Sequence, residues 1–320
     1  DEFYSTIADA LAGTNAGGTI YIQSSHYAES ITIDKQIKLI AMDGEEEGGA
    51  VTVGSITLAG GADVSGSSGV TSADVTVQAV ASVPQGILLA SVGGTVTVED
   101  GTYAGPIVVN KSITLKSRNL GGAVLNFSGQ VSGLIVDADG VTIDGFKIAG
   151  NATTRFGVYI RGGAVGRTDV SIRNNEIYGV AGNIGSGYAI GILADANVGN
   201  AGFGVNSGLE IIDNIIRNIG GGTVQGAGMS LQEVEGDIPG AGAVVKGNAI
   251  HSLHGAEATG IQVADSGIGY NNNPSSGVQI IDNDIDAPAG IVVYAEGSSV
   301  GVGEDRKSTR LNSSHQIISY

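Results

Sequence analysis

The sequence predicts an all-β protein built as a parallel β-helix, a solenoid in which each turn of the chain adds short strands to stacked parallel sheets. Two recurring patterns support this prediction. One is a phrase of alternating apolar residues that ends in a small polar pair and an isoleucine, and the other is a strand that begins with glycine. The composition agrees: the 320 residues include 54 glycines and 5% aromatic residues, which suits short strands joined by tight turns.

The repeat phrase predicts a strand, a bend and the start of another strand. Its copies are Val170–Ile177, Leu209–Ile216, Val244–Ile250 and Val278–Ile285, with a looser copy at Val141–Ile148. Each full copy holds an asparagine two residues before its final isoleucine, and the intervals between these asparagines are 39, 34 and 35 residues, the length of one solenoid turn with a loop. We expect these asparagines to stack and to hydrogen-bond as an internal ladder. They are Asn175, Asn214, Asn248 and Asn283.

The glycine-led strands lie between the repeat phrases. They begin at Gly157, Gly191, Gly228, Gly260 and Gly290, and alternate residues after each glycine are apolar. Alternation of this kind places one face of a strand toward the interior. Each turn therefore carries at least two short parallel strands.

The first third of the chain contains an older-looking duplication. The segment Gly17–Leu39 recurs without a gap, 76 residues later, as Gly93–Leu115. A short helix is expected before each copy, near Thr6–Leu11 and Pro84–Ala90. Short amphipathic helices are suitable caps for the open end of a β-helix, whose end strands would otherwise be exposed edges.

The order of helix, Gly-Gly-Thr-Ile-x-Ile, Tyr and Ile-x-Ile-x-Lys-x-Ile-x-Leu resembles the N-terminal signature of the pectin-lyase-like superfamily. The Asn-Asn-x-Ile phrases resemble its generic repeats, and the resemblance covers most of residues 4–300. It implies a right-handed parallel β-helix with short N-terminal capping helices. The superfamily includes polysaccharide lyases, glycoside hydrolases and non-catalytic surface proteins, so the fold alone does not choose a function. The polygalacturonase-like and pectate-lyase-like motifs are missing.

Three segments are expected along the chain. Residues 1–80 form a first unit of cap and β-helix, and residues 81–304 form the main right-handed parallel β-helix. Residues 305–320 have no glycine and no repeat phrase, and they resemble a translated sequencing adapter. We interpret this tail as non-native and exclude it from the fold.

Charge and cysteine content exclude several classes of protein. The net charge of −17 argues against nucleic acid as a partner, because phosphates require a basic surface. The chain has no cysteine, so it has neither disulfides nor thiolate metal sites. No apolar run reaches transmembrane length, so no membrane insertion is expected. No cofactor is evident, although the acidity leaves calcium open.

One group of charged residues is a candidate catalytic centre. Arg217, His251 and Asp286 each follow the final isoleucine of a repeat phrase, and Tyr178 holds the same place in an earlier copy. If the isoleucines point inward, these side chains point outward and form a column, which Asp284 joins. Carboxylates near a histidine and an arginine could abstract a proton, hydrolyse a glycosidic bond or bind calcium. The alternative is a solvated face whose charges alternate favourably across strands.

A second, weaker group follows the glycine-led strands. Together with Tyr178, its members are candidates for binding a substrate: Tyr159, Arg161, Asp195, Glu233 and Asp265. A surface ion pair between Arg161 and Asp195 is the alternative explanation. Nearby, Asp137–Gly140 begins like a calcium loop but lacks the later ligands, and a plain turn is the preferred interpretation.

The function expected from these features is that of an extracellular or cell-surface module, adhesin-like, which binds polysaccharide or a surface glycan without cleaving it. Two alternatives stay open. One is a polysaccharide lyase or glycoside hydrolase acting on acidic polysaccharide, and the other is a structural stalk.

Overall fold

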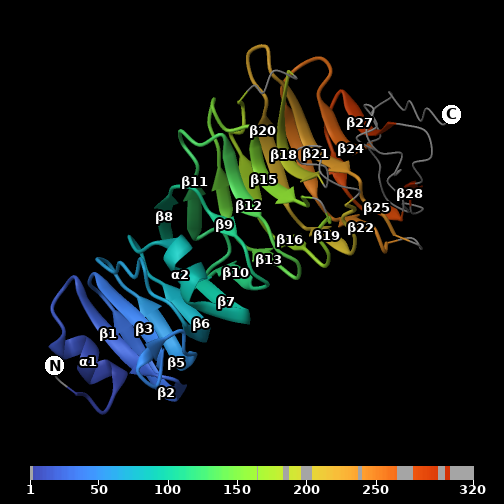
Figure 1. The fold of residues 1–320 in the computed structure, drawn as a ribbon. Helices are drawn as coiled ribbons and strands as arrows, with labels where there is room; N and C mark the ends of the chain where they lie inside the picture. The colour runs from blue at the N-terminus through green and yellow to red at the C-terminus, as the bar shows by residue number, and fades with distance from the viewer. Residues whose placement is uncertain are drawn as a thin grey trace. The chain divides into compact units, whose positions relative to one another are not determined.

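The computed structural model describes residues 3–163, 165–182, 187–195, 204–236, 240–264, 277–294 and 300–302. The fold class is confirmed: the chain is an all-β right-handed parallel β-helix with two short helices (Figure 1). Two compact units are present. Unit 1 comprises Asp1–Tyr103 and Ser112–Val124, and unit 2 comprises Ala104–Lys111 and Leu125–Tyr320. The expected segment boundaries at residues 80 and 304 stay predictions.

Unit 1 contains a small sheet and a larger parallel sheet. The small sheet has the order β1 (Gly18–Gln23), β3 (Ile37–Asp43) and β4 (Glu46–Glu47). The larger sheet has the order β2 (Ser25–Ile33), β5 (Val51–Leu58), β6 (Val70–Val77), β7 (Ala90–Val98) and β10 (Thr114–Ser117). The chain passes between the units within β8 (Gly101–Ala104), after Lys111 and within β11 (Ala123–Asn126).

Both expected helices are present in unit 1, with ends that differ by one or two residues from the prediction. Helix α1 (Ile7–Gly13) begins after Thr6, whose hydroxyl accepts a hydrogen bond from the Asp9 main-chain N–H at 3.0 Å. The Glu29 carboxylate accepts the N–H groups of the first two helical residues, each at 3.1 Å, so the free donors of the first turn are satisfied. Helix α2 (Val83–Leu89) has a proline in its first turn, where a missing N–H costs nothing.

Unit 2 consists of three parallel sheets, each crossed by successive turns of the chain (Figure 1). The first sheet contains β13 (Thr142–Asp144), β16 (Ser171–Arg173), β19 (Leu209–Ile212), β22 (Ala243–Lys246), β25 (Val278–Ile281) and β28 (Val300–Val302). The second contains β14 (Lys147–Ala149), β17 (Glu176–Tyr178), β20 (Ile215–Ile219), β23 (Ala249–Leu253) and β26 (Asp284–Ile285). The third contains β9 (Val108–Val109), β12 (Ser132–Val136), β15 (Phe156–Arg161), β18 (Tyr188–Asp195), β21 (Gln225–Gln232), β24 (Thr259–Ala264) and β27 (Ala289–Tyr294).

The core of unit 2 is made of aliphatic stacks, one from each sheet. In the second sheet the stack contains Ile148, Ile177, Ile216 and Ile250, which are Cα partners on successive strands and are fully buried. Burial of these isoleucines confirms that the last residue of the repeat phrase points inward in these four copies, while Ile285 in the last copy is partly buried. Their neighbours along the strands must therefore face outward, because strand side chains alternate.

The recurring glycines of the third sheet are required by this core. A Cβ built on Gly191 would lie 2.6 Å from the Ile216 side chain and 2.5 Å from the Gly228 carbonyl oxygen. A Cβ on Gly228 would meet Ile250 and Gly260 in the same way. Successive turns thus use glycine where the third sheet faces the isoleucine stack, since no side chain fits there.

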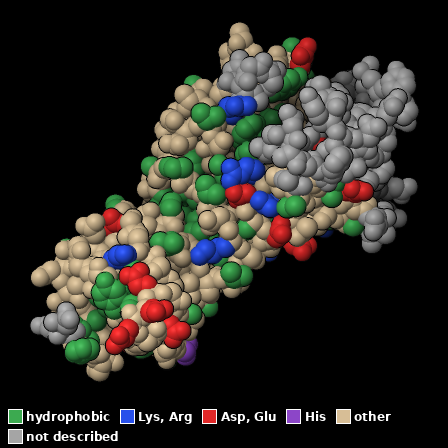
Figure 2. Space-filling model, in the orientation of Figure 1, with side chains coloured by type: hydrophobic (Ala, Val, Ile, Leu, Met, Phe, Trp, Pro, Cys, Tyr) green, Lys and Arg blue, Asp and Glu red, His purple; other side chains and the backbone are tan. Residues whose placement is uncertain are grey.

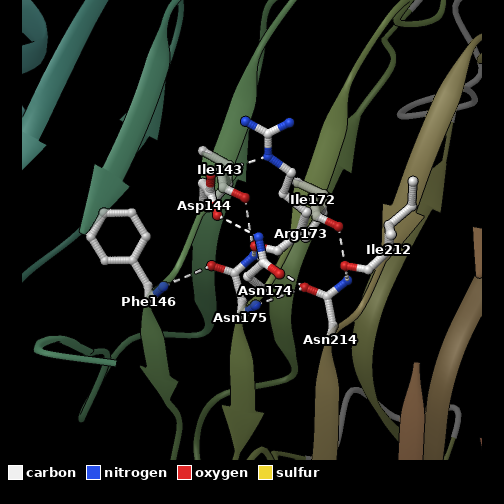
Figure 3. Close-up of polar contacts among 9 residues, drawn as sticks. All are labelled: Ile143, Asp144, Phe146, Ile172, Arg173, Asn174, Asn175, Ile212 and Asn214. Atoms are coloured by element: carbon white, nitrogen blue, oxygen red, sulfur yellow. Dashed lines mark hydrogen bonds and ion pairs between the residues drawn. The ribbon is translucent and has the colours of Figure 1, made fainter. Parts of the chain in front are cut away.

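The asparagine ladder is confirmed and is fully hydrogen-bonded (Figure 3). The Asn214 side-chain oxygen accepts the Asn175 main-chain N–H at 3.0 Å, and its amide group donates to the Ile172 carbonyl at 2.8 Å. The same pattern continues through Asn248 to Asn283. At the other end, Phe146 occupies the ladder position and donates its N–H to Asn175. The ladder therefore satisfies main-chain groups at a bend that the sheets leave unpaired.

The residue before each ladder position has a positive φ. These residues are Gly145, Asn174, Asp213, Gly247 and Asp282. Glycine, asparagine and aspartate are the residues that adopt the left-handed region at least cost. The small polar pair of the repeat phrase is thus a left-handed residue followed by a ladder residue.

Candidate functional site

The second sheet of unit 2 positions the candidate catalytic column. Tyr178, Arg217 and His251 are successive Cα partners. The main-chain N–H of Asp286 donates to the Ile250 carbonyl at 2.8 Å, which continues this register to the next turn. Because the isoleucines before them are inward, these four residues lie on the outward face. The structure therefore brings the sequence-derived column together in one row.

Arg217 is already engaged by neighbours in this row. Its Nε and Nη2 atoms donate to Glu176 Oε1 at 2.8 and 2.5 Å. Its guanidinium also covers the Tyr178 ring, 4.7 Å from the centroid, a favourable cation–π contact. Arg217 is thus held as part of a Glu–Arg–Tyr group and fixes the position of the Tyr178 ring.

The other members of the column are less constrained. His251 Nδ1 lies 3.1 Å from Ser252 Oγ, while Asp284 and Asp286 are exposed. Asp284 is the Cα partner of Ala249, so it lies one position behind the row. Within the described ranges, no ion pair joins either aspartate to Arg217 or His251. Chemically, the face offers two free carboxylates, an imidazole and an aromatic ring covered by arginine.

The third sheet carries a separate ionic cluster. Asp137 follows β12 and accepts hydrogen bonds from Arg161 on β15 and from Arg167, the latter at 2.6 Å. Partial burial alone would raise the pKa of Asp137, but the two guanidinium groups hold it below its usual value. The Asp137 carboxylate is occupied by arginines, which agrees with the preferred interpretation of Asp137–Gly140 as a turn.

Tyr159 lies beside this cluster in an apolar layer. It packs against Phe156, with ring centroids 5.2 Å apart, and against a buried cluster that includes Ile190 and Leu193. Burial, reinforced by the negative charge of Asp195, raises the pKa of Tyr159 to about 12. The ring is therefore a packing element with a polar tip rather than a fully exposed platform.

The remaining substrate-binding candidates do not all lie together in the structure. Asp195 is the Cα partner of Arg161, so the structure brings these two residues together with Tyr159. Glu233 follows β21, is only 2% exposed and has φ 51°, and its main-chain carbonyl accepts the Asn206 N–H at 2.8 Å. Asp265 lies outside the described residues. The roles of all these residues in binding stay predictions.

Sequence reasoning missed three members of these groups. Glu176 directly precedes the inward Ile177, as Asp284 precedes Ile285, so the same alternation rule would have identified it. Asp137 and Arg167 lie outside the repeat phrases. Their contact depends on how two loops fold, and the repeat pattern of the sequence does not predict it.

The described parts of the chain contain no group of three or more histidine, aspartate or glutamate side chains suited to a metal ion. No described helix is long and apolar enough to cross a membrane. On the face drawn in Figure 2, acidic side chains gather over the first strands of unit 1. The fold and these faces define a parallel β-solenoid that presents ordered rows of polar side chains.

No protein-family model, curated protein or solved structure matches the chain.

Proposed function

We propose that this chain is an extracellular or cell-surface β-helix module of the pectin-lyase-like type, adhesin-like, that binds polysaccharide without cleaving it. The observation that carries the proposal is the outward row on four successive turns, formed by Tyr178, Arg217 and His251 on strands and by Asp286 directly after β26. Adjacent strands are about 4.8 Å apart, so the row presents hydrogen-bonding groups at a short, regular interval. A row of this kind suits an extended polymer with repeating polar units.

The state of Arg217 favours binding over cleavage. A guanidinium that stabilised charge in a transition state would need to reach the reacting atoms. Arg217 instead donates to Glu176 and covers Tyr178. This arrangement builds a rigid, weakly charged platform from which His251 and the exposed aspartates extend.

The enzyme alternative has one observation in its favour. Asp284 begins β26, Asp286 directly follows it, and both are exposed; residues two apart on an extended chain have Cα atoms separated by about 6.7 Å. Glycoside hydrolases use pairs of carboxylates separated by roughly 5 to 10 Å. A lyase or hydrolase acting on acidic polysaccharide is therefore the second candidate function, and a structural stalk is the third.

One experiment separates the three candidates. The chain is tested against a panel of acidic and neutral polysaccharides, with and without calcium, for retention on the polymer and for release of reducing or unsaturated ends. His251→Ala and Asp286→Asn are compared with Lys246→Ala, which changes an exposed residue of the first sheet. We expect retention without product, weakened by the first two substitutions and unchanged by the third.

Product release that both column variants abolish would replace the binding proposal with the enzyme. If the chain neither binds nor cleaves any polysaccharide of the panel, the structural stalk is the candidate function that remains. Equal retention by all four proteins would show that binding uses another face. Loss of retention only when calcium is removed would add a metal to the site.

A further inference from the structure

Two rows of small polar side chains cross the larger sheet of unit 1. The first row is Thr32, Thr57, Thr76 and Thr97, which are Cα partners on β2, β5, β6 and β7. The second row joins Ser30 and Ser55, which are Cα partners on β2 and β5, to Asp74, Thr95 and Thr114, which are Cα partners on β6, β7 and β10. The next residues, Ile56 on β5 and Val75 on β6, are Cα partners, which places Ser55 beside Asp74. We call these two rows the hydroxyl face.

The hydroxyl face points outward, and three of the four threonines in its first row are accessible, whereas Thr97 on β7 is only 4% exposed. Between the two rows lie Ile31, Ile56, Val75 and Val96, each at most 2% exposed, which fixes the opposite direction for the rows. Thr32 is exposed, and Thr57 and Thr76 are partly exposed. In the described part of unit 1 these three hydroxyls have no protein partner, so each can bind solvent.

The register irregularities of this sheet lie before the two rows and leave the rows themselves regular. The register shifts between Tyr27 and Ser30 on β2 and between Ser72 and Asp74 on β6, and beyond those points it is unbroken. The Ser72 hydroxyl stabilises the bulge by donating to the Asp74 carbonyl at 2.9 Å and accepting the Asp74 N–H at 3.1 Å. The irregularity is therefore confined to the start of the strands.

Regularity gives the face a two-dimensional repeat. Neighbours within a row are about 4.8 Å apart, and the two rows are separated by about 6.7 Å, two residues along a strand. Threonine is β-branched and stiff at χ1, so each threonine of the array presents a hydroxyl and a methyl group in a restricted orientation. Water held by such an array is ordered in advance, which reduces the entropic cost of joining it to a crystal.

We propose that the hydroxyl face binds ice. The oxygen repeats on the faces of hexagonal ice are similar in size to both spacings of the array. The neutral hydroxyl groups of the rows, on β2, β5 and β6, can make many weak contacts with a solid of matching period, whereas a soluble ion or small ligand would contact only one or two positions. This activity is independent of the polysaccharide binding proposed for unit 2.

The charged residues of the array are expected to weaken its contact with ice. Asp74 stands inside the second row, and Lys116 is the Cα partner of Thr97 and ends the first row. With Arg118 and four threonine or alanine neighbours they line an open depression of about 280 Å³. A charged group holds its own hydration shell, which does not fit an ice lattice. Replacing Asp74 with threonine should therefore extend the array and strengthen ice binding.

The test measures incorporation of the labelled chain into slowly growing ice, together with thermal hysteresis. We expect the wild-type chain to enter the ice. Thr76→Tyr and Thr57→Tyr place a large ring in the centre of the first row, and both should be excluded like a non-binding control protein. Asp74→Thr should raise the incorporated fraction. Thr19→Tyr, at an exposed threonine on β1 in the small sheet of unit 1, is the matched control and should behave as wild type.

Circular dichroism of each variant separates loss of binding from loss of fold. Exclusion of the wild-type chain from ice would overturn the proposal, as would ice incorporation by folded Thr76→Tyr and Thr57→Tyr at the wild-type level. Binding to crystalline cellulose or chitin that these two variants abolish, without binding to ice, would assign the face to a solid polysaccharide instead.

Discussion

Each ladder asparagine satisfies main-chain groups that lie on different turns of the solenoid. Asn214 is fully buried and accepts the Asn175 N–H, while its amide donates to Ile172 and Asn248. An alanine at this position would leave a buried N–H and a buried carbonyl without partners, and each orphaned group costs about 1–3 kcal/mol. The ladder therefore contributes through the groups that it prevents from being orphaned.

We expect Asn214→Ala to lower the free energy of unfolding by on the order of 3 kcal/mol. Chemical denaturation followed by circular dichroism measures this change. Asn126→Ala is the control, since the Asn126 side chain accepts only the Ser128 N–H in an exposed turn. If both substitutions lower the free energy of unfolding by the same amount, the ladder has no special role in stability.

The ion-paired Asp137 is expected to make the stability of the folded chain depend on pH in the acidic range. Its pKa is lowered in the folded state by Arg161 and Arg167, so its contribution to stability is complete above the unfolded value of about 3.9. The contribution is lost as the pH falls from there through the lower folded-state pKa. Asp137→Asn should therefore lose less stability than wild type between pH 5 and pH 2, about the range in which an ion-paired aspartate titrates.

The measurement is the free energy of unfolding of both proteins across this range. Asp34→Asn, which removes an exposed carboxylate from unit 1, is the control and should follow the wild-type curve. Parallel curves for wild type and Asp137→Asn would show that the Asp137 ion pairs add nothing to acid stability.

Residue-level prediction from the sequence works where a residue has a fixed offset from a repeat. The ladder and the outward column were both predictable, because each is tied to an inward isoleucine. The contact between Asp137 and Arg167 was not, since Arg167 lies in a loop after β15. The hydroxyl face was not predictable from sequence periodicity for a related reason. Its threonines stand at irregular intervals, because the connections between β2, β5, β6 and β7 differ in length.

At the scale of the element, the glycine-led strands explain how two sheets share one core. Alanine at Gly228 would place a Cβ 2.5 Å from the Gly260 carbonyl oxygen and 2.6 Å from Ile250 Cγ2. The first of these atoms belongs to the main chain and cannot move aside without shifting the next turn. Overpacking of this kind typically costs about 1–3 kcal/mol.

Gly228→Ala should therefore lower the free energy of unfolding by about 2 kcal/mol. Gly290→Ala offers a matched control in the last described copy of the same strand, where nothing lies within 4 Å of the added Cβ. We expect the control to stay within about 0.5 kcal/mol of wild type. The thermal midpoints of the two variants, measured side by side, check the difference; equal midpoints would contradict the packing argument.

At the scale of the whole molecule, the fold class followed from the sequence because every turn repeats the same inward pattern. Periodicity alone indicated at least two strands for each turn, and unit 2 has three sheets. The first of these sheets is formed by the opening residues of the repeat phrases, and the bend within each phrase separates it from the second. The activity was not predictable in the same way, because outward residues are free to vary without affecting the core.

The last prediction concerns the C-terminal tail, residues 305–320, which lie outside the described residues. The tail has no repeat phrase, which is the pattern that supplies an inward isoleucine and a ladder asparagine in the described turns. Its deletion should leave the thermal unfolding midpoint within about 1 °C of the parent, because a change of 1 kcal/mol would move the midpoint by a few degrees. Truncation after residue 276 is the informative comparison. It removes Asn283, which accepts the Asn248 N–H at 3.0 Å, and β25, which pairs with β22 along four residues. That truncation should lower the midpoint clearly, whereas a loss of equal size on removing residues 305–320 alone would show that the tail is part of the folded solenoid.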